Sequence, residues 1–249
     1  MRRILAVSIA AGLAAITLLV PATTAGASTP GILDAITASD QVVLVTGPST
    51  RATRGTLRRF ARVQGAWTPV GAPSPVLLGR SGLVDGSRRV QSSGTTPMGT
   101  YRLASAFGRA ADPGSRLPYV RVDRDDAWTY NPQVPSTYNL FQSAARSWAG
   151  YGRYVEHLWQ MGPQYDYVVT TDFNEPPVAS VRRGADGVRR TSQPSDTRRG
   201  GGIFLHVSKG EPTAGCVSMP RAAMRTLVTW LDPASNPVVV ITTTSRLTA

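Results

Sequence analysis

The stretch that decides the fold is residues 203–231, IFLHVSKGEPTAGCVSMPRAAMRTLVTWL. Its first five residues form an apolar run typical of a β-strand, in which the two-residue period places Phe204 and His206 on the same face. A polar turn follows and returns the chain to Cys216. The stretch therefore predicts a strand carrying a histidine, a turn leading to a cysteine, and then a helix.

The helix after the cysteine has recognisable ends. Pro220 suits a first helical position, and Pro233 stops the helix. Between them apolar residues recur at i, i+3, i+4 and i+7, at Met224, Leu227, Val228 and Leu231. This spacing predicts one apolar stripe that faces a core.

Outside this stretch, short apolar or alternating runs broken by Gly, Pro and Ser predict further strands. They cover residues 41–46, 57–63, 76–78, 101–106, 165–173 and 238–241. Residues 95–101 are expected to form a turn that leads into a strand. Residues 108–150 are expected to cross the surface without regular structure. Residues 182–202 hold pairs of arginines among Gly, Ser, Asp and Thr, which is typical of a flexible basic loop. The fold class is mainly β with one main helix.

The N-terminus has the features of a signal peptide. Arg2 and Arg3 precede an apolar run over residues 4–20, which is shorter than the roughly 20 residues of a stable membrane span. Cleavage after Ala27 is expected to leave no stable span and a secreted, cell-wall-associated protein, by either the general or the twin-arginine route. The predicted organisation is a signal peptide 1–27, a short leader 28–40, one catalytic domain 41–243 and a tail 244–249.

Charge favours anionic partners. The chain has 27 Lys and Arg residues against 15 Asp and Glu, a formal net charge of +12. Such a balance suits nucleic acid, acidic membranes or anionic wall polymers. For an exported protein we expect cell-wall polymers, not nucleic acid.

The single cysteine is the strongest indication of chemistry. It cannot form an intrachain disulfide, so Cys216 is a buried thiol, an intermolecular bridge or a reactive group. His206, ten positions upstream, can take the thiol proton. Gly215 allows a sharp turn that directs amides at an oxyanion, and the helix that follows is expected to favour a thiolate. We interpret Cys216 as a nucleophile and His206 as its base.

Several other chemistries lack the residues they need. Two histidines and one cysteine are too few for a zinc site, and neither a phosphate loop nor a G-x-S-x-G elbow is present. We therefore expect no metal and no cofactor.

The motifs around these residues resemble those of the YkuD-type L,D-transpeptidases. The signature of that family is a histidine on a strand and then S-H-G-C-(I/V/L)-(R/N)-(M/L), which residues 203–206 and 213–219 resemble. Residues 96–101, TPMGTY, look like the family's T-P-x-G-x-(F/Y) strand. The T-A-G-C-V-S form is similar to a secreted actinobacterial branch.

The resemblance implies a β-sandwich catalytic domain and covalent acyl transfer on peptidoglycan stem peptides. Cys216, activated by His206, would attack the carbonyl of the third stem residue and expel the terminal D-alanine. A side-chain amine of a neighbouring stem would then accept the acyl group, which makes a 3→3 crosslink. The amides of Gly215 and Cys216 would stabilise the oxyanion, and the carbonyl of Val207 would orient the histidine.

Substrate contacts are expected beside the thiol, at Thr213, Ala214 and Ser218. Ala214 and Ser218 stand where the family has a histidine and an Arg or Asn. His157, the only other histidine, is either a substrate contact or a structural residue, and the loop 182–202 either a lid for wall polymers or a solvated insertion. Two other functions stay open: an L,D-carboxypeptidase, in which water takes the acyl group, and a wall-binding protein without activity.

Overall fold

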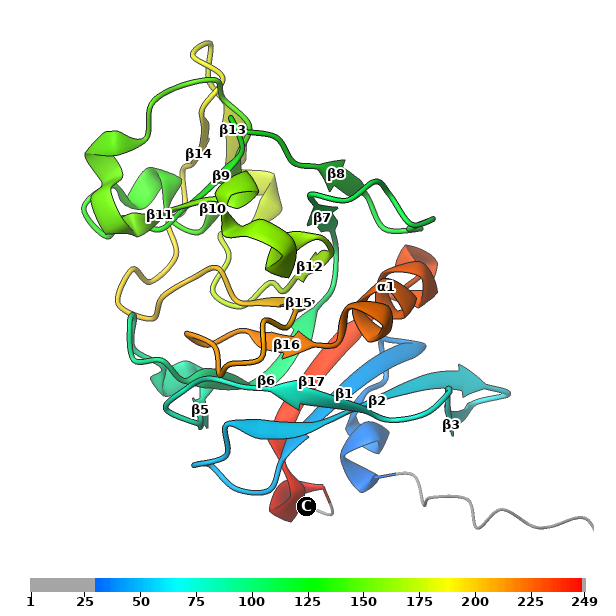
Figure 1. Cartoon of the computed structure of the whole chain (residues 1–249). Coiled ribbons are helices and arrows are strands. Elements are labelled where there is room, and N and C mark those ends of the chain that lie inside the picture. Colours follow the sequence, from blue (N-terminus) through cyan, green and yellow to red (C-terminus); the bar gives the residue numbers. More distant parts are fainter. Residues whose placement is uncertain (1–29, 248–249) are drawn as a thin grey trace, which may run out of the picture.

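The computed structural model describes residues 30–247, so the predicted signal peptide 1–27 lies outside the described residues. Figure 1 shows a large sheet with a helix against it and a group of short strands above. Within residues 30–247, α1 (Arg221–Trp230) is the one α-helix, and the mainly β class is confirmed. No helix in this part of the chain has the length and apolar character needed to span a membrane.

Twelve strands of the described chain form one mixed sheet. Across the sheet they run β5 (Leu83–Asp85), β6 (Thr96–Arg102), β17 (Val238–Thr243), β1 (Gln41–Gly47), β2 (Arg54–Val63), β4 (Ser74–Leu77), β16 (Val217–Met219), β15 (Phe204–Val207), β12 (Val168–Thr170), β7 (Ala106–Gly108) and β8 (Tyr119–Arg121), with β3 (Ala66–Pro69) paired to β2. The pairs β5–β6, β17–β1, β16–β15 and β7–β8 are parallel, and the other pairs are antiparallel.

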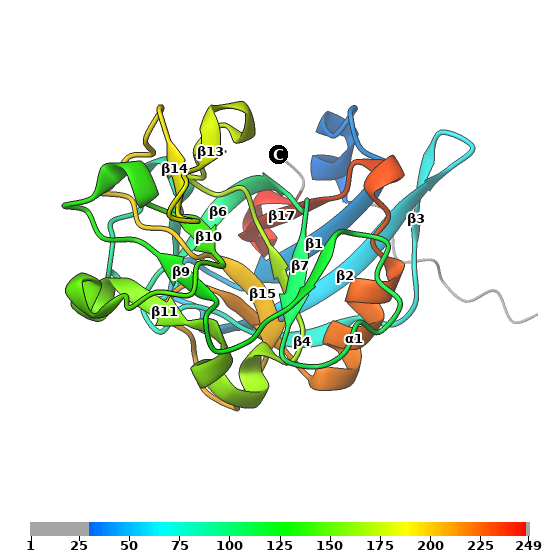
Figure 2. The same ribbon diagram turned by 90° about the horizontal axis from the view of Figure 1, so that it is seen from above.

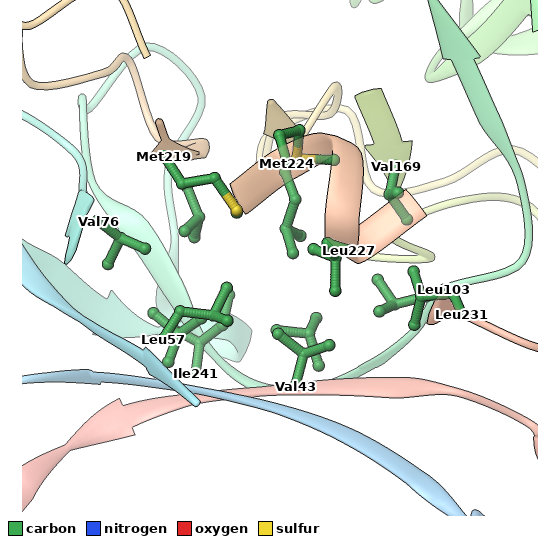
Figure 3. Close-up of a cluster of buried hydrophobic side chains, with 14 of the residues drawn as sticks. Val43, Leu57, Val76, Leu103, Val169, Met219, Met224, Leu227, Leu231 and Ile241 are labelled. Atoms are coloured by element: carbon green, nitrogen blue, oxygen red, sulfur yellow. The ribbon is translucent and has the colours of Figure 1, made fainter. Parts of the chain in front are cut away.

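The sheet and α1 enclose the main hydrophobic core (Figure 3). The predicted helical stripe is buried there, at Met224, Leu227, Val228 and Leu231. It packs with residues from strands far apart in the sheet, such as Val43 of β1 and Val169 of β12. Distant strands of the same sheet therefore contribute to one core around the helix. Burying each large apolar side chain contributes about 1.5–3 kcal/mol. Pro220, predicted as the first helical residue, is the N-cap, so α1 begins one residue later, at Arg221.

Strand β15 separates two environments. Leu205 and Val207 point into the main core, whereas Phe204 and His206 point to the opposite face. On that face the ring of Phe204 lies edge-on to Trp128, with ring centroids 4.8 Å apart. The strand that builds the core therefore also presents His206 away from it, as the alternation predicts.

A second region, which we call the polar lobe, covers the His206 face and comprises residues 122–165 and 176–201. It contains the small sheet β10 (Leu140–Gln142), β9 (Ala127–Thr129) and β11 (Val155–His157), and the hairpin β13 (Val181–Arg183) and β14 (Arg189–Thr191). Figures 1 and 2 show these strands grouped apart from α1. The prediction that residues 108–150 are irregular and superficial was wrong: Trp128, Tyr138 and Trp148 are buried there. Strands of three residues are too short to give a periodic signal.

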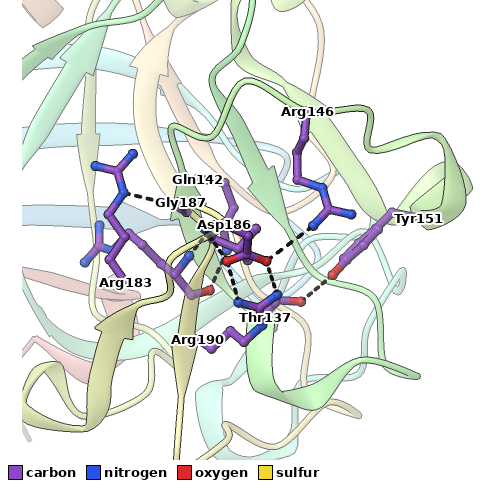
Figure 4. A network of polar contacts seen from close by, with 10 residues as sticks. Thr137, Gln142, Arg146, Tyr151, Arg183, Asp186, Gly187 and Arg190 are labelled. Atoms are coloured by element: carbon purple, nitrogen blue, oxygen red, sulfur yellow. Dashed lines mark hydrogen bonds and ion pairs between the residues drawn. The ribbon is translucent and has the colours of Figure 1, made fainter.

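The prediction that residues 182–202 form a flexible loop was also wrong, because most of the β13–β14 hairpin lies in this segment. At the hairpin turn, Asp186 accepts hydrogen bonds from Arg190 at 2.9 and 2.6 Å and lies 3.9 Å from Arg146 (Figure 4). Val188 of this segment is buried against Ala144 and Trp148. Composition alone misses this order, because it does not show that Asp186 and Asp196 form ion pairs with Arg190 and Arg198.

Several predicted strands differ in detail. Residues 95–101, predicted as a turn leading into a strand, belong to β6 already from Thr96, and Pro97 is tolerated there because β17 pairs only from Gly99 onwards. Residues 103–105, predicted as strand, connect β6 to β7. The predicted strand 165–173 shortens to β12, because Tyr165 belongs to a preceding 3₁₀ segment.

Short 3₁₀ segments complete the described chain. They are η1 (Gly31–Ala35), η2 (Gly86–Arg88), η3 (Pro135–Thr137), η4 (Ala149–Tyr154), η5 (Leu158–Tyr165), η6 (Val178–Ser180), η7 (Pro233–Ser235) and η8 (Thr244–Arg246). In η1, Leu33 is buried and its carbonyl accepts a hydrogen bond from Trp67 Nε1 at 2.9 Å. Ile32 donates its amide to the carbonyl of Leu247 at 3.1 Å, so both ends of the described chain pack on the outer face of the sheet.

Candidate active site

His206 and Cys216 come together because β15 and β16 are parallel neighbours. His206 lies in β15 directly opposite Ser218 of β16, and Cys216 immediately precedes β16. Both line one cavity of about 260 Å³ at the boundary between the main sheet and the polar lobe. The sheet side supplies Thr213, Ala214, Cys216, Ser218 and His206, and the lobe side supplies Glu156, Met161, Gln164 and Tyr165.

The imidazole of His206 is buried and fixed in orientation. Its Nδ1 lies 2.9 Å from the carbonyl oxygen of Val207. A carbonyl only accepts hydrogen bonds, so Nδ1 carries the proton and Nε2 is left as a base. Burial lowers the pKa of His206 to about 4, against hydrogen bonding to the backbone of Val207 and Gln164. At neutral pH the ring is therefore uncharged and can accept a proton.

The thiol of Cys216 contacts backbone groups at the start of β15 and just before it. Its Sγ donates to the carbonyl of Gly202 at 3.3 Å and accepts from the amide of Phe204 at 3.4 Å. Burial raises the pKa of Cys216 to about 12; Glu156 adds to the rise, and the Phe204 amide and Arg89 oppose it. The raised pKa keeps the resting thiol protonated, and within residues 30–247 no hydrogen bond joins Sγ to His206.

The expected help from the helix N-terminus is not present. Strand β16 and Pro220 lie between Cys216 and the start of α1 at Arg221. The five residue-to-residue steps from Cys216 to Arg221 span roughly 16 Å in extended backbone, whereas the effect of a helix dipole falls off within one turn. The cation that acts on the thiol is instead Arg89.

Arg89 is a site residue that sequence reasoning missed. It is 5% exposed, and its guanidinium donates to the carbonyls of Thr95 at 2.9 Å, Arg199 at 2.8 Å and Ala214 at 3.5 Å. It thus joins three distant segments behind the cysteine turn. It lies in no recognisable motif, so the sequence gives no signal for it.

The turn before the cysteine is held by one threonine. Thr213 Oγ1 donates to the carbonyl of Cys216 at 2.6 Å and accepts from the amide of Gly215 at 3.0 Å. Gly215 has φ +146°, and a Cβ there would lie 2.7 Å from Arg89 and 2.9 Å from the Thr95 carbonyl. No larger residue fits, and the Gly215 amide, expected at the oxyanion, is already bonded within the turn.

The remaining predicted residues lie as follows. Ala214 is exposed and lines the cavity. Ser218 is 1% exposed, lines the cavity and has an Oγ with no hydrogen-bond partner among the described residues. His157, in β11, pairs with Ala127 of β9 and is not among the residues that line the cavity. Its neighbour Glu156 lines it instead, because successive side chains of a strand point to opposite faces.

Glu156 is the second residue that sequence reasoning missed. Its Oε2 accepts a hydrogen bond of 2.6 Å from the hydroxyl of Tyr165, whose ring lies edge-on to His206 with centroids 5.5 Å apart. Burial raises the pKa of Glu156, and the Tyr165 hydrogen bond opposes this rise. A glutamate next to a histidine in a short strand carries no motif.

No metal centre accompanies the cavity within the described chain. Residues 30–247 contain no group of three or more His, Cys, Asp or Glu side chains that could hold a metal ion. Titratable groups that line the cavity include the Cys216 thiol, the His206 imidazole and the Glu156 carboxyl.

Comparison with known proteins identifies the family. The model of the YkuD L,D-transpeptidase catalytic domain matches residues 56–240. A search of curated proteins found no match. The solved structure of Bd1075 from Bdellovibrio bacteriovorus is similar, at 16% identity and a TM-score of 0.39 over 82% of this chain and 48% of that one. The chain thus spans about half of that protein's length. Because the family match covers most of the sequence, the chain belongs to the YkuD L,D-transpeptidase catalytic domain family.

Proposed function

We propose that the protein is a cysteine-dependent L,D-transpeptidase acting on peptidoglycan stem peptides outside the cytoplasmic membrane. The observation that carries the proposal is one cavity of a YkuD domain that contains both the Cys216 thiol and an imidazole whose Nδ1 is held by the Val207 carbonyl. A fixed Nδ1 leaves Nε2 as the base that thiol chemistry requires. Export and cell-wall association are proposed from the N-terminal sequence pattern.

In the first step the thiol turns from Gly202 and gives its proton to His206 Nε2. The Cys216 sulfur then attacks the carbonyl of the third stem residue, and the tetrahedral intermediate collapses. His206 returns the proton to the amine of the leaving D-alanine, which leaves a thioester on Cys216. Because burial raises the pKa of Cys216 to about 12, transfer to the imidazole during attack is favoured over a resting thiolate.

The oxyanion of this intermediate needs a donor beside the sulfur. The Cys216 amide makes no hydrogen bond within residues 30–247, whereas the Gly215 amide donates to Thr213 Oγ1. We therefore assign the Cys216 amide as an oxyanion donor and Gly215 as the residue that gives the turn its shape. Thr213 holds the turn and is a positioning residue.

The test uses the mature chain with a disaccharide tetrapeptide, followed by mass spectrometry. A dimer linked through third stem residues supports the proposal, tripeptide alone indicates an L,D-carboxypeptidase, and unchanged substrate indicates a binding protein. A carbapenem should add covalently to Cys216. Cys216→Ala and His206→Ala should abolish the adduct, whereas the matched histidine control His157→Ala should keep it; normal acylation of His206→Ala would refute the role of His206 as base.

A further inference from the structure

The cavity contains a carboxyl that the thiol–imidazole chemistry does not use. Glu156 reaches the cavity from β11 in the polar lobe, opposite the sheet side that carries Cys216 and His206. It is close enough to influence the pKa of the thiol. A carboxylate there opposes formation of a thiolate, so it does not assist the first step. Glu156 thus lines the same cavity as Cys216 and is available for another step.

One oxygen of this carboxyl is fixed and the other is available. Oε2 accepts the 2.6 Å hydrogen bond from Tyr165, a residue 3% exposed and packed against His206. Oε1 has no hydrogen-bond partner among residues 30–247. Tyr165 thus holds the carboxyl in one orientation with a free acceptor oxygen, which is the arrangement expected of a site for a donor.

No cation of the described chain pairs with Glu156. The salt bridges formed within residues 30–247 do not include it. The cations that line the same cavity, Arg80 and Lys209, are exposed residues, and Arg89 donates to backbone carbonyls. A partly buried carboxylate without a counter-ion is costly, and a bound ammonium group would remove that cost.

We propose that Glu156, positioned by Tyr165, binds the cationic amine of the acyl acceptor and takes its first proton. This inference rests on the proposed function and assigns a residue of this chain to the amine acceptor that transpeptidation requires. A primary alkylammonium has a pKa near 10.4, as in lysine, and reaches the enzyme charged. It therefore needs both a counter-ion and a base before it can attack, whereas water needs no counter-ion.

The proton and bond balance is closed by the residues of the cavity. Glu156 accepts one proton from the ammonium and leaves a neutral amine. The amine nitrogen attacks the thioester carbonyl and forms the C–N bond, while His206 takes the second proton. The C–S bond then breaks, His206 gives its proton to the departing sulfur, and Glu156 releases the first proton to solvent. The products are an amide, a free thiol and one proton.

The experiment compares Glu156→Gln with the wild-type chain in two half-reactions. Carbapenem acylation reports the first half, and transfer from a tetrapeptide donor to a stem bearing a free side-chain amine reports the second. We expect Glu156→Gln to acylate at the wild-type rate and to lose amine transfer by roughly 10²-fold, the scale of general base catalysis. Tyr165→Phe keeps the ring against His206 and should lose less. Glu175→Gln, a glutamate of a different cavity, should transfer normally.

Hydroxylamine provides a second test because it is largely uncharged at neutral pH. It needs neither a counter-ion nor prior deprotonation, so Glu156→Gln should release the acyl-enzyme to hydroxylamine at the wild-type rate. Equal loss with both nucleophiles would overturn the proposal, as would slowed acylation or an undiminished amine transfer. Wild-type chain that yields only tripeptide would also overturn it. A wild-type chain that forms no carbapenem adduct would instead refute the proposed function itself.

Discussion

The main sheet and the polar lobe are stabilised by different physics, and the active site lies where they meet. The sheet is built on long runs such as β1 and β17, whose alternate residues fill apolar clusters on both faces. The lobe has short strands, and buried polar residues such as Thr129 and Gln142 stand among its aromatic rings. Apolar burial is non-directional, whereas a buried polar network must satisfy each donor and acceptor. Substitutions in the sheet should therefore lower stability gradually, in proportion to the apolar area lost. In the lobe, large losses of stability should be confined to a few residues.

The largest effect is expected at Asn139, which joins the lobe to the sheet. Its Oδ1 accepts from Trp128 Nε1 at 2.9 Å and from the Gly202 amide at 2.8 Å, and its Nδ2 donates to the carbonyls of Phe173 at 3.0 Å and Asn174 at 2.8 Å. Asn139→Ala leaves three buried groups and the partly buried Asn174 carbonyl without this partner and should lower the free energy of unfolding by about 4 kcal/mol. Urea unfolding measures the loss.

The matched control for this prediction is Asn131→Ala. Asn131 is also a buried asparagine of the lobe, but its side chain makes one local hydrogen bond, to the amide of Gln133. We expect a loss of about 1 kcal/mol. Similar losses for both variants would show that the lobe does not depend on the Asn139 network.

The second effect is on the sheet side, at Leu227 of α1. This residue is 1% exposed and packs in the main core (Figure 3). Leu227→Ala should lower the free energy of unfolding by about 3 kcal/mol through lost burial and a cavity. Arg225→Ala, an exposed position of the same helix, should change stability by less than about 0.5 kcal/mol. A Leu227→Ala loss larger than that of Asn139→Ala would reverse the contrast between the two regions.

The same contrast explains how far sequence reasoning reached. The helical stripe, the strand carrying His206 and the turn with Gly215 follow from apolar spacing and from glycine's freedom at positive φ, which are local rules. Glu156 and Arg89 reach the cavity through pairing and packing between segments distant in sequence. The residues that flank Glu156 and Arg89 in the sequence do not predict that these side chains reach the cavity. The thiol side of the site was therefore predictable, and the carboxyl side was not.

At Glu175 we expect a substitution that raises the free energy of unfolding, in contrast to the losses above, and by an amount that depends on pH. It lines a cavity of about 500 Å³ next to the lobe, and burial raises its pKa to about 8, with Asp172 adding to the rise and Arg189 opposing it. The folded state therefore holds a proton that the unfolded state has lost between about pH 4.5 and 8. Stability from this group is present below pH 4.5 and is lost as pH rises through 8.

Glu175→Gln should therefore stabilise the protein by about 2 kcal/mol at pH 8 relative to its effect at pH 4.5. Thermal unfolding across this pH range measures the difference. Glu211→Gln, at an exposed position, should give no such trend. A constant difference between Glu175→Gln and wild type at all pH values would mean that Glu175 ionises normally in the folded protein.

The smallest stability effect is expected at Ser218, a polar residue on the sheet side. Its Oγ is buried without a hydrogen-bond partner among the described residues, beside His206 in the neighbouring strand. Ser218→Ala removes an unsatisfied group, so the change in unfolding free energy should stay within about 0.5 kcal/mol. Thr213→Ala is the contrasting variant, since it removes two hydrogen bonds of the cysteine turn. A large loss in Ser218→Ala would mean that its hydroxyl has a partner in solution, and the sheet side would then share the polar dependence of the lobe.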